Sequence, residues 1–252
     1  MNYENICYKR TCLSQVIVRI DFLEFIETEL LFHADMEKEI LKSLPKKGMQ
    51  KIVRFQTMNV IADPDGSRTE QTTQDGRQQE FSDSRGNKLI IANKYLVLEI
   101  NSYTTYENLL GMLNPVLSSI FSKKQFTSMR TGVRYINIFR EKEVKPIKRY
   151  FKPSISALID QKKEGQQCIR SMALDEYYYD DMHLNFRYGM FNSNYPNPIK
   201  EMEFALDFDC YCDEALNGIS NIIEHINTGH EKIQNLFEES ITDALRGVMN
   251  NG

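Results

Sequence analysis

The alternation of apolar and polar residues predicts several β-strands in this 252-residue chain. Within Ser14 to Phe25, the β-branched residues Val16, Val18 and Ile20 alternate with more polar neighbours, as in a strand that buries one face. Comparable runs of strand character occur at residues 51–60, 88–103, 130–140, 174–179, 182–190 and 203–211.

Apolar residues at a spacing of three and four predict helices between these strands. A polar helix is expected over residues 30–44, a second helix around residues 109–120, and a long helical region over residues 216–245. Pro115 is expected to kink the second helix or to begin a new one, and Thr228-Gly229 is expected to divide the last one. The pattern predicts an α+β fold in which antiparallel sheets are backed by helices.

Two strand patterns repeat along the chain. Residues 95–103 and 203–211 align at an offset of 108 residues, and each runs into an amphipathic helix. The similarity indicates two tandem meander-plus-helix units, residues 1–146 and 147–252, which stand apart or form one compact unit. The alternative is coincidence, because any half-buried antiparallel strand shows such alternation.

The segment from Ala62 to Asn87 is the most hydrophilic part of the chain. Turn signals recur in it, at Asp63-Pro64-Asp65-Gly66 and at Asp75-Gly76. We expect a long exposed hairpin region with the character of a loop. A solvent-exposed segment with no binding role is favoured over a lid or a binding loop.

Composition narrows the class of protein. Apolar residues make up 41% of the chain and charged residues 26%, with a net charge of −4, as in an ordinary globular protein. Interspersed charges argue against a general electrostatic attraction to nucleic acid or to an anionic membrane. No apolar run approaches the roughly 20 residues of a membrane-spanning helix, and the first residues lack a signal-peptide core. A cytoplasmic location is therefore expected.

The five cysteines include no CxxC pair, which favours reduced thiols over a disulfide framework. Cys210 and Cys212 lie two residues apart, on the same strand face as the apolar residues of 202–208, and are predicted to be core residues. A zinc site that adds His183 or His225 is the alternative. It is disfavoured because the sequence offers no second closely spaced pair of ligands.

Two charged clusters have the residue types of a site. Asp207 and Asp209 share a strand face, where they could bind a hard cation with His183 or simply face solvent. In residues 130–140, three arginines share one face, whereas Tyr135 and Asn137 point to the other. The arginines could bind phosphate, or pair with acidic residues across the sheet. The residues concerned are Arg130, Arg134 and Arg140, with Glu99, Asp207 and Asp209 as the acidic candidates.

Several motifs resemble a sporadically distributed prokaryotic family of uncharacterised proteins of about this length. They are the Arg-x-Gly-x-Arg-Tyr-Ile-Asn motif beginning at Arg130, the strand from Leu206 to Tyr211, and the segment from Phe237 to Asp243. The resemblance spans nearly the whole chain, although the chain lacks the tryptophans expected of that family, and Tyr106 is the candidate substitute. It implies no activity and no catalytic residue. The patchy distribution of that family is typical of accessory loci of the defence or toxin–antitoxin type.

The function expected from these observations is non-enzymatic protein binding within such an accessory system. The expected partner is another protein, with no membrane, metal or cofactor assigned, and oligomeric state is left open. One alternative is a nucleic-acid or nucleotide binder that uses Arg130 and Arg134, and another is a metal-dependent hydrolase built on Asp207, Asp209 and His183. No catalytic residue is assigned, and the candidate binding residues are Arg130, Arg134, Tyr135, Asn137, Arg140, Asp207 and Asp209.

Overall fold

A computed structural model describes residues 8–63, 66–141, 144–157 and 168–250. Its strands form one antiparallel sheet in the order β2-β4-β5-β6-β1-β7-β10-β9-β8, with β3 paired to β4 and β11 paired to β7. The predicted α+β fold is confirmed. The strands are β1 (Leu13–Phe22), β2 (Lys46–Lys47), β3 (Lys51–Asp63), β4 (Gly66–Ser82), β5 (Lys88–Ala92), β6 (Tyr95–Ile100), β7 (Thr127–Glu141), β8 (Ser171–Tyr179), β9 (Met182–Phe191), β10 (Met202–Cys212) and β11 (Leu216–Asn217).

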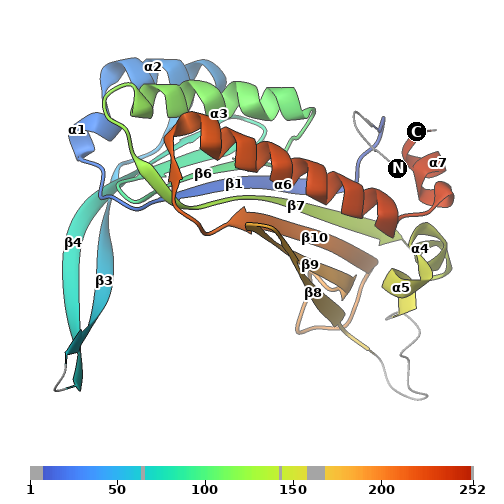
Figure 1. The fold of residues 1–252 in the computed structure, drawn as a ribbon. Coiled ribbons are helices and arrows are strands. Elements are labelled where there is room, and N and C mark those ends of the chain that lie inside the picture. The colour runs from blue at the N-terminus through green and yellow to red at the C-terminus, as the bar shows by residue number, and fades with distance from the viewer. Residues whose placement is uncertain (1–7, 64–65, 142–143, 158–167, 251–252) are drawn as a thin grey trace.

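The longer helices lie side by side over one face of this sheet (Figure 1). Residues such as Val18, Leu98, Leu206 and Phe208 point towards them and are almost completely buried. This layer of strands and helices forms the hydrophobic core, since each element buries its apolar face against the other. The helices are α1 (Thr28–Leu31), α2 (Ala34–Ser43), α3 (Tyr106–Phe121), α4 (Val144–Tyr150), α5 (Pro153–Ser156), α6 (Gly218–Ser240) and α7 (Asp243–Asn250).

The order of the strands is the same in two halves of the sheet. In the first half β1 pairs with β6, followed by β5 and β4, and in the second β7 pairs with β10, followed by β9 and β8. Each half then continues into a helix, α3 or α6, and the two halves meet where β1 pairs antiparallel with β7. This order agrees with the predicted repeat, and the change from one half to the other falls between α3 and β7, whereas the boundary near residue 146 stays a prediction.

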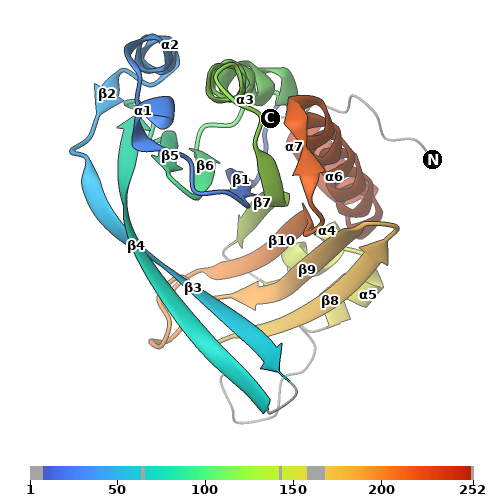
Figure 2. The same ribbon diagram turned by 60° about the vertical axis from the view of Figure 1, so that its left-hand side comes forward.

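The hydrophilic segment from Ala62 to Asn87 forms part of a hairpin, as expected, although it is mostly strand rather than loop. It contains β4, which pairs with β3 residue by residue from Lys51 and Gln78 to Asp63 and Gly66. The hairpin of β3 and β4 projects beyond the other strands (Figure 2). Residues 71–75 of β4 are all exposed, so this part of the strand lacks the alternation by which a half-buried strand is recognised.

The expected division of the last helix is wrong, and no second helix begins at Pro115, which leaves a kink as the remaining alternative there. Pro115 lies inside the continuous helix α3, and α6 runs without interruption through Thr228 and Gly229. An added Cβ at Gly229 would lie 3.0 Å from Val133 Cγ1, so this glycine allows α6 to approach β7 closely. Helix α6 ends instead at Ser240, before Ile241.

The predicted burial of two reduced cysteines is confirmed. Cys210 and Cys212 are free thiols, completely buried in the core. None of the helices within the described residues is long and apolar enough to span a membrane.

Candidate functional site

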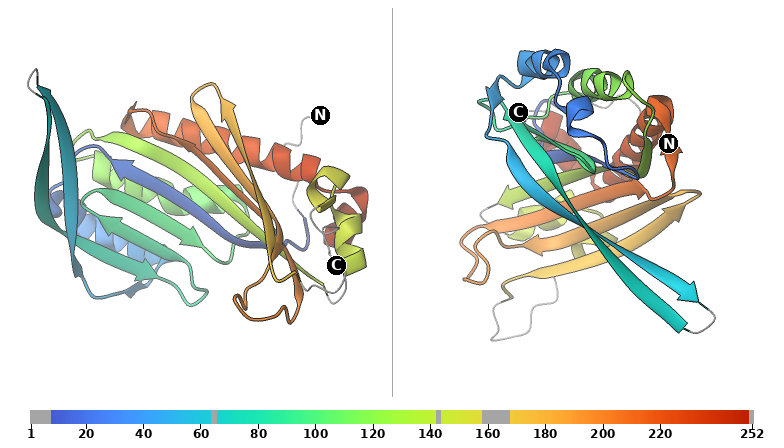
Figure 3. Two further views of the ribbon diagram at one scale, coloured as in Figure 1. Left: turned by 90° about the horizontal axis from the view of Figure 1, so that it is seen from below. Right: turned by 90° about the vertical axis from the view of Figure 1, so that its left-hand side faces the viewer.

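The face of the sheet opposite the helices is its more polar face. Viewed from that side, the strands lie in front of α2, α3 and α6 (Figure 3). We call it the open face, meaning the surface formed by side chains that alternate with the core positions of β1, β5, β6, β7, β8, β9 and β10. Strand β7 contributes Arg130, Arg134 and Arg140 to it, and β10 contributes Glu203, Asp207 and Asp209.

The arginines of β7 pair with the acidic residues of β10, which is the structural alternative weighed from the sequence. Arg134 donates from Nε to Asp207 Oδ1 at 2.7 Å and from Nη2 to Oδ2 at 2.6 Å. Arg187 of β9 approaches the same carboxylate, with Nη1 3.7 Å from Oδ2. Because the buried Asp207 has two guanidinium neighbours, its charge is well compensated.

Two further pairs lie along the same strands. Arg140 Nε lies 3.0 Å from Glu203 Oε1, and Arg130 Nη2 lies 3.9 Å from Asp209 Oδ2. Burial raises the pKa of Asp209, although Arg130 and Arg134 oppose that shift. The hydrogen bonds from Arg134 to Asp207 raise the pKa of Arg134, so this arginine stays charged.

A hollow of about 450 Å³ opens at the centre of the open face. Gly132 lies at its floor, where an added Cβ would approach Tyr211 Cβ to 2.8 Å. Both charge signs and aromatic surface meet in the hollow, so it has no bias towards an anionic ligand. Its lining comprises Ile17, Arg19, Ile90, Tyr95, Val97, Glu99, Arg130, Gly132, Arg134 and Asp209.

A row of stacked side chains leads from the hollow to the edge of the sheet. The Arg130 guanidinium lies 4.1 Å from the centre of the Tyr211 ring, and Tyr211 stacks on His183 at 5.2 Å. His183 in turn lies 4.8 Å from Tyr178 on β8. We call Arg130, Tyr211, His183 and Tyr178 the aromatic row. It crosses four neighbouring strands, β7, β10, β9 and β8, because these residues share one face in register.

The aromatic row ends on a strand with an unpaired edge. Among the described strands, β8 pairs with β9 alone. Its residues on the open face are exposed, with Met172 at 38%, Leu174 at 50% and Tyr178 at 65%. Exposed apolar side chains on an unpaired edge are a common feature of strands that accept a partner strand.

The structure separates Tyr135 and Asn137 from the other candidate residues, as their alternation predicts. Both point to the helix side and line a cleft of about 500 Å³ between α3, α6 and β7. Tyr135 Oη lies 2.8 Å from His230 Nδ1, and the His230 ring stacks on Tyr106 at 3.9 Å. Burial lowers the pKa of His230 to about 4 and raises that of Tyr135, so both groups are neutral at pH 7.

The residues of the proposed hydrolase are not assembled around one point. Asp207 faces Arg134 and Arg187, whereas His183 Nε2 lies 3.6 Å from Asp213 Oδ1. Within the described part of the chain, the grouping of metal-ligating side chains comprises Asp181, Cys212 and His225 instead. Sequence reasoning weighed and disfavoured a zinc site that combined Cys210 and Cys212 with His183 or His225, and it did not place Asp181 beside Cys212 and His225.

Comparison with known proteins found no matching family model and no significant match among curated proteins. The resemblance of the Arg130 motif to an uncharacterised prokaryotic family therefore stays a prediction. The function proposed below therefore rests on the geometry of the open face.

Proposed function

We propose that this protein is a non-enzymatic recognition protein that binds another protein through the edge of β8 and the adjoining aromatic row. The observation that carries the proposal is the continuity of these two features. Exposed apolar residues Met172 and Leu174 share the open face of β8 with Tyr178, and the row runs from Tyr178 to Tyr211 and Arg130. Tyrosine and arginine are enriched in protein interfaces and dominate their binding energy.

The charge distribution supports a protein partner over a nucleic acid. A phosphate backbone is bound by basic side chains that release counterions, and this requires cationic groups free to meet phosphate. On the open face Arg134, Arg140 and Arg130 already face carboxylates of β10. A partner surface of mixed charge, with an extended segment to pair with β8, fits this arrangement better.

The hairpin of β3 and β4 offers a second point of contact in this proposal. It projects from the opposite half of the sheet, and the strand positions 71–75 are exposed. The resemblance to a sporadically distributed family supports the further proposal that the partner belongs to an accessory system of the defence or toxin–antitoxin type.

The test begins with isolation of the partner. The tagged protein, expressed at its native level in its own host, is cross-linked and purified with nuclease treatment, and the captured protein is then prepared pure. Calorimetric titration of that protein should show that Leu174→Glu weakens binding by about tenfold or more, which corresponds to about 1.4 kcal/mol. The reason is that a buried carboxylate at the β8 edge would lack a partner.

A matched leucine provides the control. Leu23 follows β1, in the middle of the sheet order, and is 53% exposed, close to the 50% of Leu174. The Leu23→Glu variant should therefore bind like the wild type. Equal affinity in both variants would refute the proposal. Dissociation of the captured complex on nuclease treatment would also refute it.

A further inference from the structure

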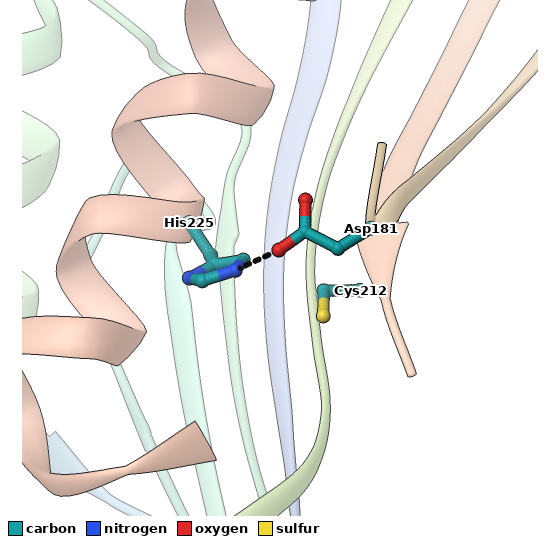
Figure 4. A group of neighbouring side chains, drawn as sticks. All are labelled: Asp181, Cys212 and His225. Atoms are coloured by element: carbon teal, nitrogen blue, oxygen red, sulfur yellow. Dashed lines mark hydrogen bonds and ion pairs between the residues drawn. The ribbon is translucent and has the colours of Figure 1, made fainter. Parts of the chain in front are cut away.

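Three potential metal ligands from separate parts of the chain converge beside the sheet. Asp181 lies in the turn between β8 and β9, Cys212 ends β10, and His225 lies on α6 (Figure 4). One ligand atom of each residue lies within 4.8 Å of the ligand atoms of the other two. Long-range packing alone brings them together, since the nearest two are separated by 13 positions in the sequence.

The hydrogen bonds of His225 fix the direction of both ring nitrogens. Nδ1 lies 2.8 Å from the backbone oxygen of Asn221, which can only accept, so Nδ1 bears the proton. The remaining nitrogen, Nε2, lies 2.7 Å from Asp181 Oδ2. A neutral imidazole would then direct a lone pair at a carboxylate oxygen. The pair therefore requires a proton or a metal ion between its two atoms.

The bond from Nδ1 to Asn221 also has the form of an outer-shell contact at a metal site. Histidines that bind a metal through one nitrogen commonly donate from the other to a backbone carbonyl, which fixes the ring and its tautomer. This contact is independent of the clustering itself, and it presents Nε2 to the space shared with Asp181 and Cys212.

The third group, Cys212, is a sulfur ligand on the same side. Its residue is completely buried, and its Sγ accepts a hydrogen bond from the Glu214 amide at 3.4 Å. This amide favours the thiolate, the form that binds metals, although burial is the larger effect and raises the pKa of the thiol while no metal is bound. Cys210 shares the strand face and the burial of Cys212 but lies outside the cluster.

We propose that Asp181, Cys212 and His225 form a Zn²⁺ site with one sulfur, one nitrogen and one oxygen ligand. The set favours zinc over Mg²⁺ or Ca²⁺, which prefer oxygen ligands alone. Three protein ligands leave the fourth tetrahedral position to water, and the Asp181 side chain is 43% exposed, so the site is reached from solvent.

Binding requires a rearrangement of the ligands. Two ligand atoms about 2.0 Å from a tetrahedral zinc ion are about 3.3 Å apart, so Nε2 and Oδ2 would separate by roughly half an ångström from their hydrogen-bonded distance of 2.7 Å. A sulfur ligand lies about 3.5 Å from the other ligand atoms of such a site, and the three atoms here lie within 4.8 Å of one another, so Cys212 Sγ approaches the other two by up to about one ångström. Rotation of the partly exposed Asp181 supplies part of this shift. The thiol proton and the proton of the His225–Asp181 pair pass to the buffer as the metal binds. The bound ion links the β8–β9 turn, β10 and α6.

Cobalt is the probe for this site, because Co²⁺ occupies zinc sites and reports its ligands by absorption. The full-length protein, stripped with chelator, should bind one Co²⁺ with a sulfur-to-cobalt charge-transfer band and visible bands of tetrahedral intensity. Zn²⁺ should displace it and raise the melting temperature. Cys212→Ser should abolish the charge-transfer band, and Asp181→Asn should weaken binding of both metals at least tenfold.

The buried cysteine of the same strand is the matched control. Cys210→Ser should keep the band and the affinity of the wild type, and circular dichroism shows whether each variant is folded. Asp181→Asn lies at the surface, so it keeps the test decisive if Cys212→Ser does not fold. Absence of the band in the wild type, or a band that survives in folded Cys212→Ser, would show that the cluster is only a hydrogen-bonded acid–imidazole pair.

Discussion

Acidification from pH 7 to pH 4 should cost the protein about 3 kcal/mol of unfolding free energy through His230 alone. Burial between α6 and β7 lowers its pKa from 6.5 to about 4 in the folded state. Because the folded pKa is depressed, the unfolded chain binds this proton first as the pH falls. The stabilisation is therefore complete above pH 6.5 and is lost as the pH falls from there towards 4.

The measurement is a series of urea titrations at intervals between pH 7 and pH 4. His230→Gln should show a smaller loss of stability over this range than the wild type, by about 3 kcal/mol, because glutamine does not titrate. Parallel curves for wild type and His230→Gln would contradict the assignment of a buried neutral imidazole.

Gly189→Ala should lower the unfolding free energy by about 3 kcal/mol, from backbone strain and steric overlap together. Gly189 of β9 has a φ of 139°, and an added Cβ would lie 2.2 Å from the Ser171 oxygen. That oxygen belongs to the backbone of β8, so the substitution forces the two strands apart. The absence of a side chain at Gly189 thus allows β8, the proposed binding strand, to pair closely with β9.

A second glycine gives the opposite expectation for the same chemical change. Gly111 lies in α3, with no described atom within 4 Å of an added Cβ, so Gly111→Ala should stabilise the protein by about 0.5–1 kcal/mol. Thermal and urea unfolding of the two variants would compare them directly. Equal effects in the two variants would contradict the described contact between β8 and β9.

Much of the fold was accessible from the sequence because most strands bury one face. Alternation located the strands later assigned as β1, β7 and β10, and it placed Cys210 and Cys212 on the core side. It failed for β4, in which the polar residues 71–75 are exposed on both faces of the strand. Glycine in α6 suggested a helix end, but tertiary packing against Val133 requires that glycine within the helix.

The candidate site was only partly predictable for a related reason. Two of the three acidic candidates, Asp207 and Asp209, were named correctly, since charged residues of neighbouring strands commonly pair across a sheet, whereas Arg140 pairs with Glu203, which was not named. The specific pairing of Arg134 with Asp207, however, depends on the strand register. The aromatic row also depends on register, because it joins residues from four strands. The Asp181, Cys212 and His225 cluster depends further on how α6 packs, and no local spacing signals it.

Hydrogen–deuterium exchange with and without the isolated partner protein tests the central claim most directly. Backbone amides at the unpaired edge of β8 exchange readily unless another strand accepts their hydrogen bonds. Our account predicts slower exchange in residues 171–179 on complex formation, together with protection around Tyr211 on β10. Protection confined to α3 and α6, with β8 unchanged, would contradict it.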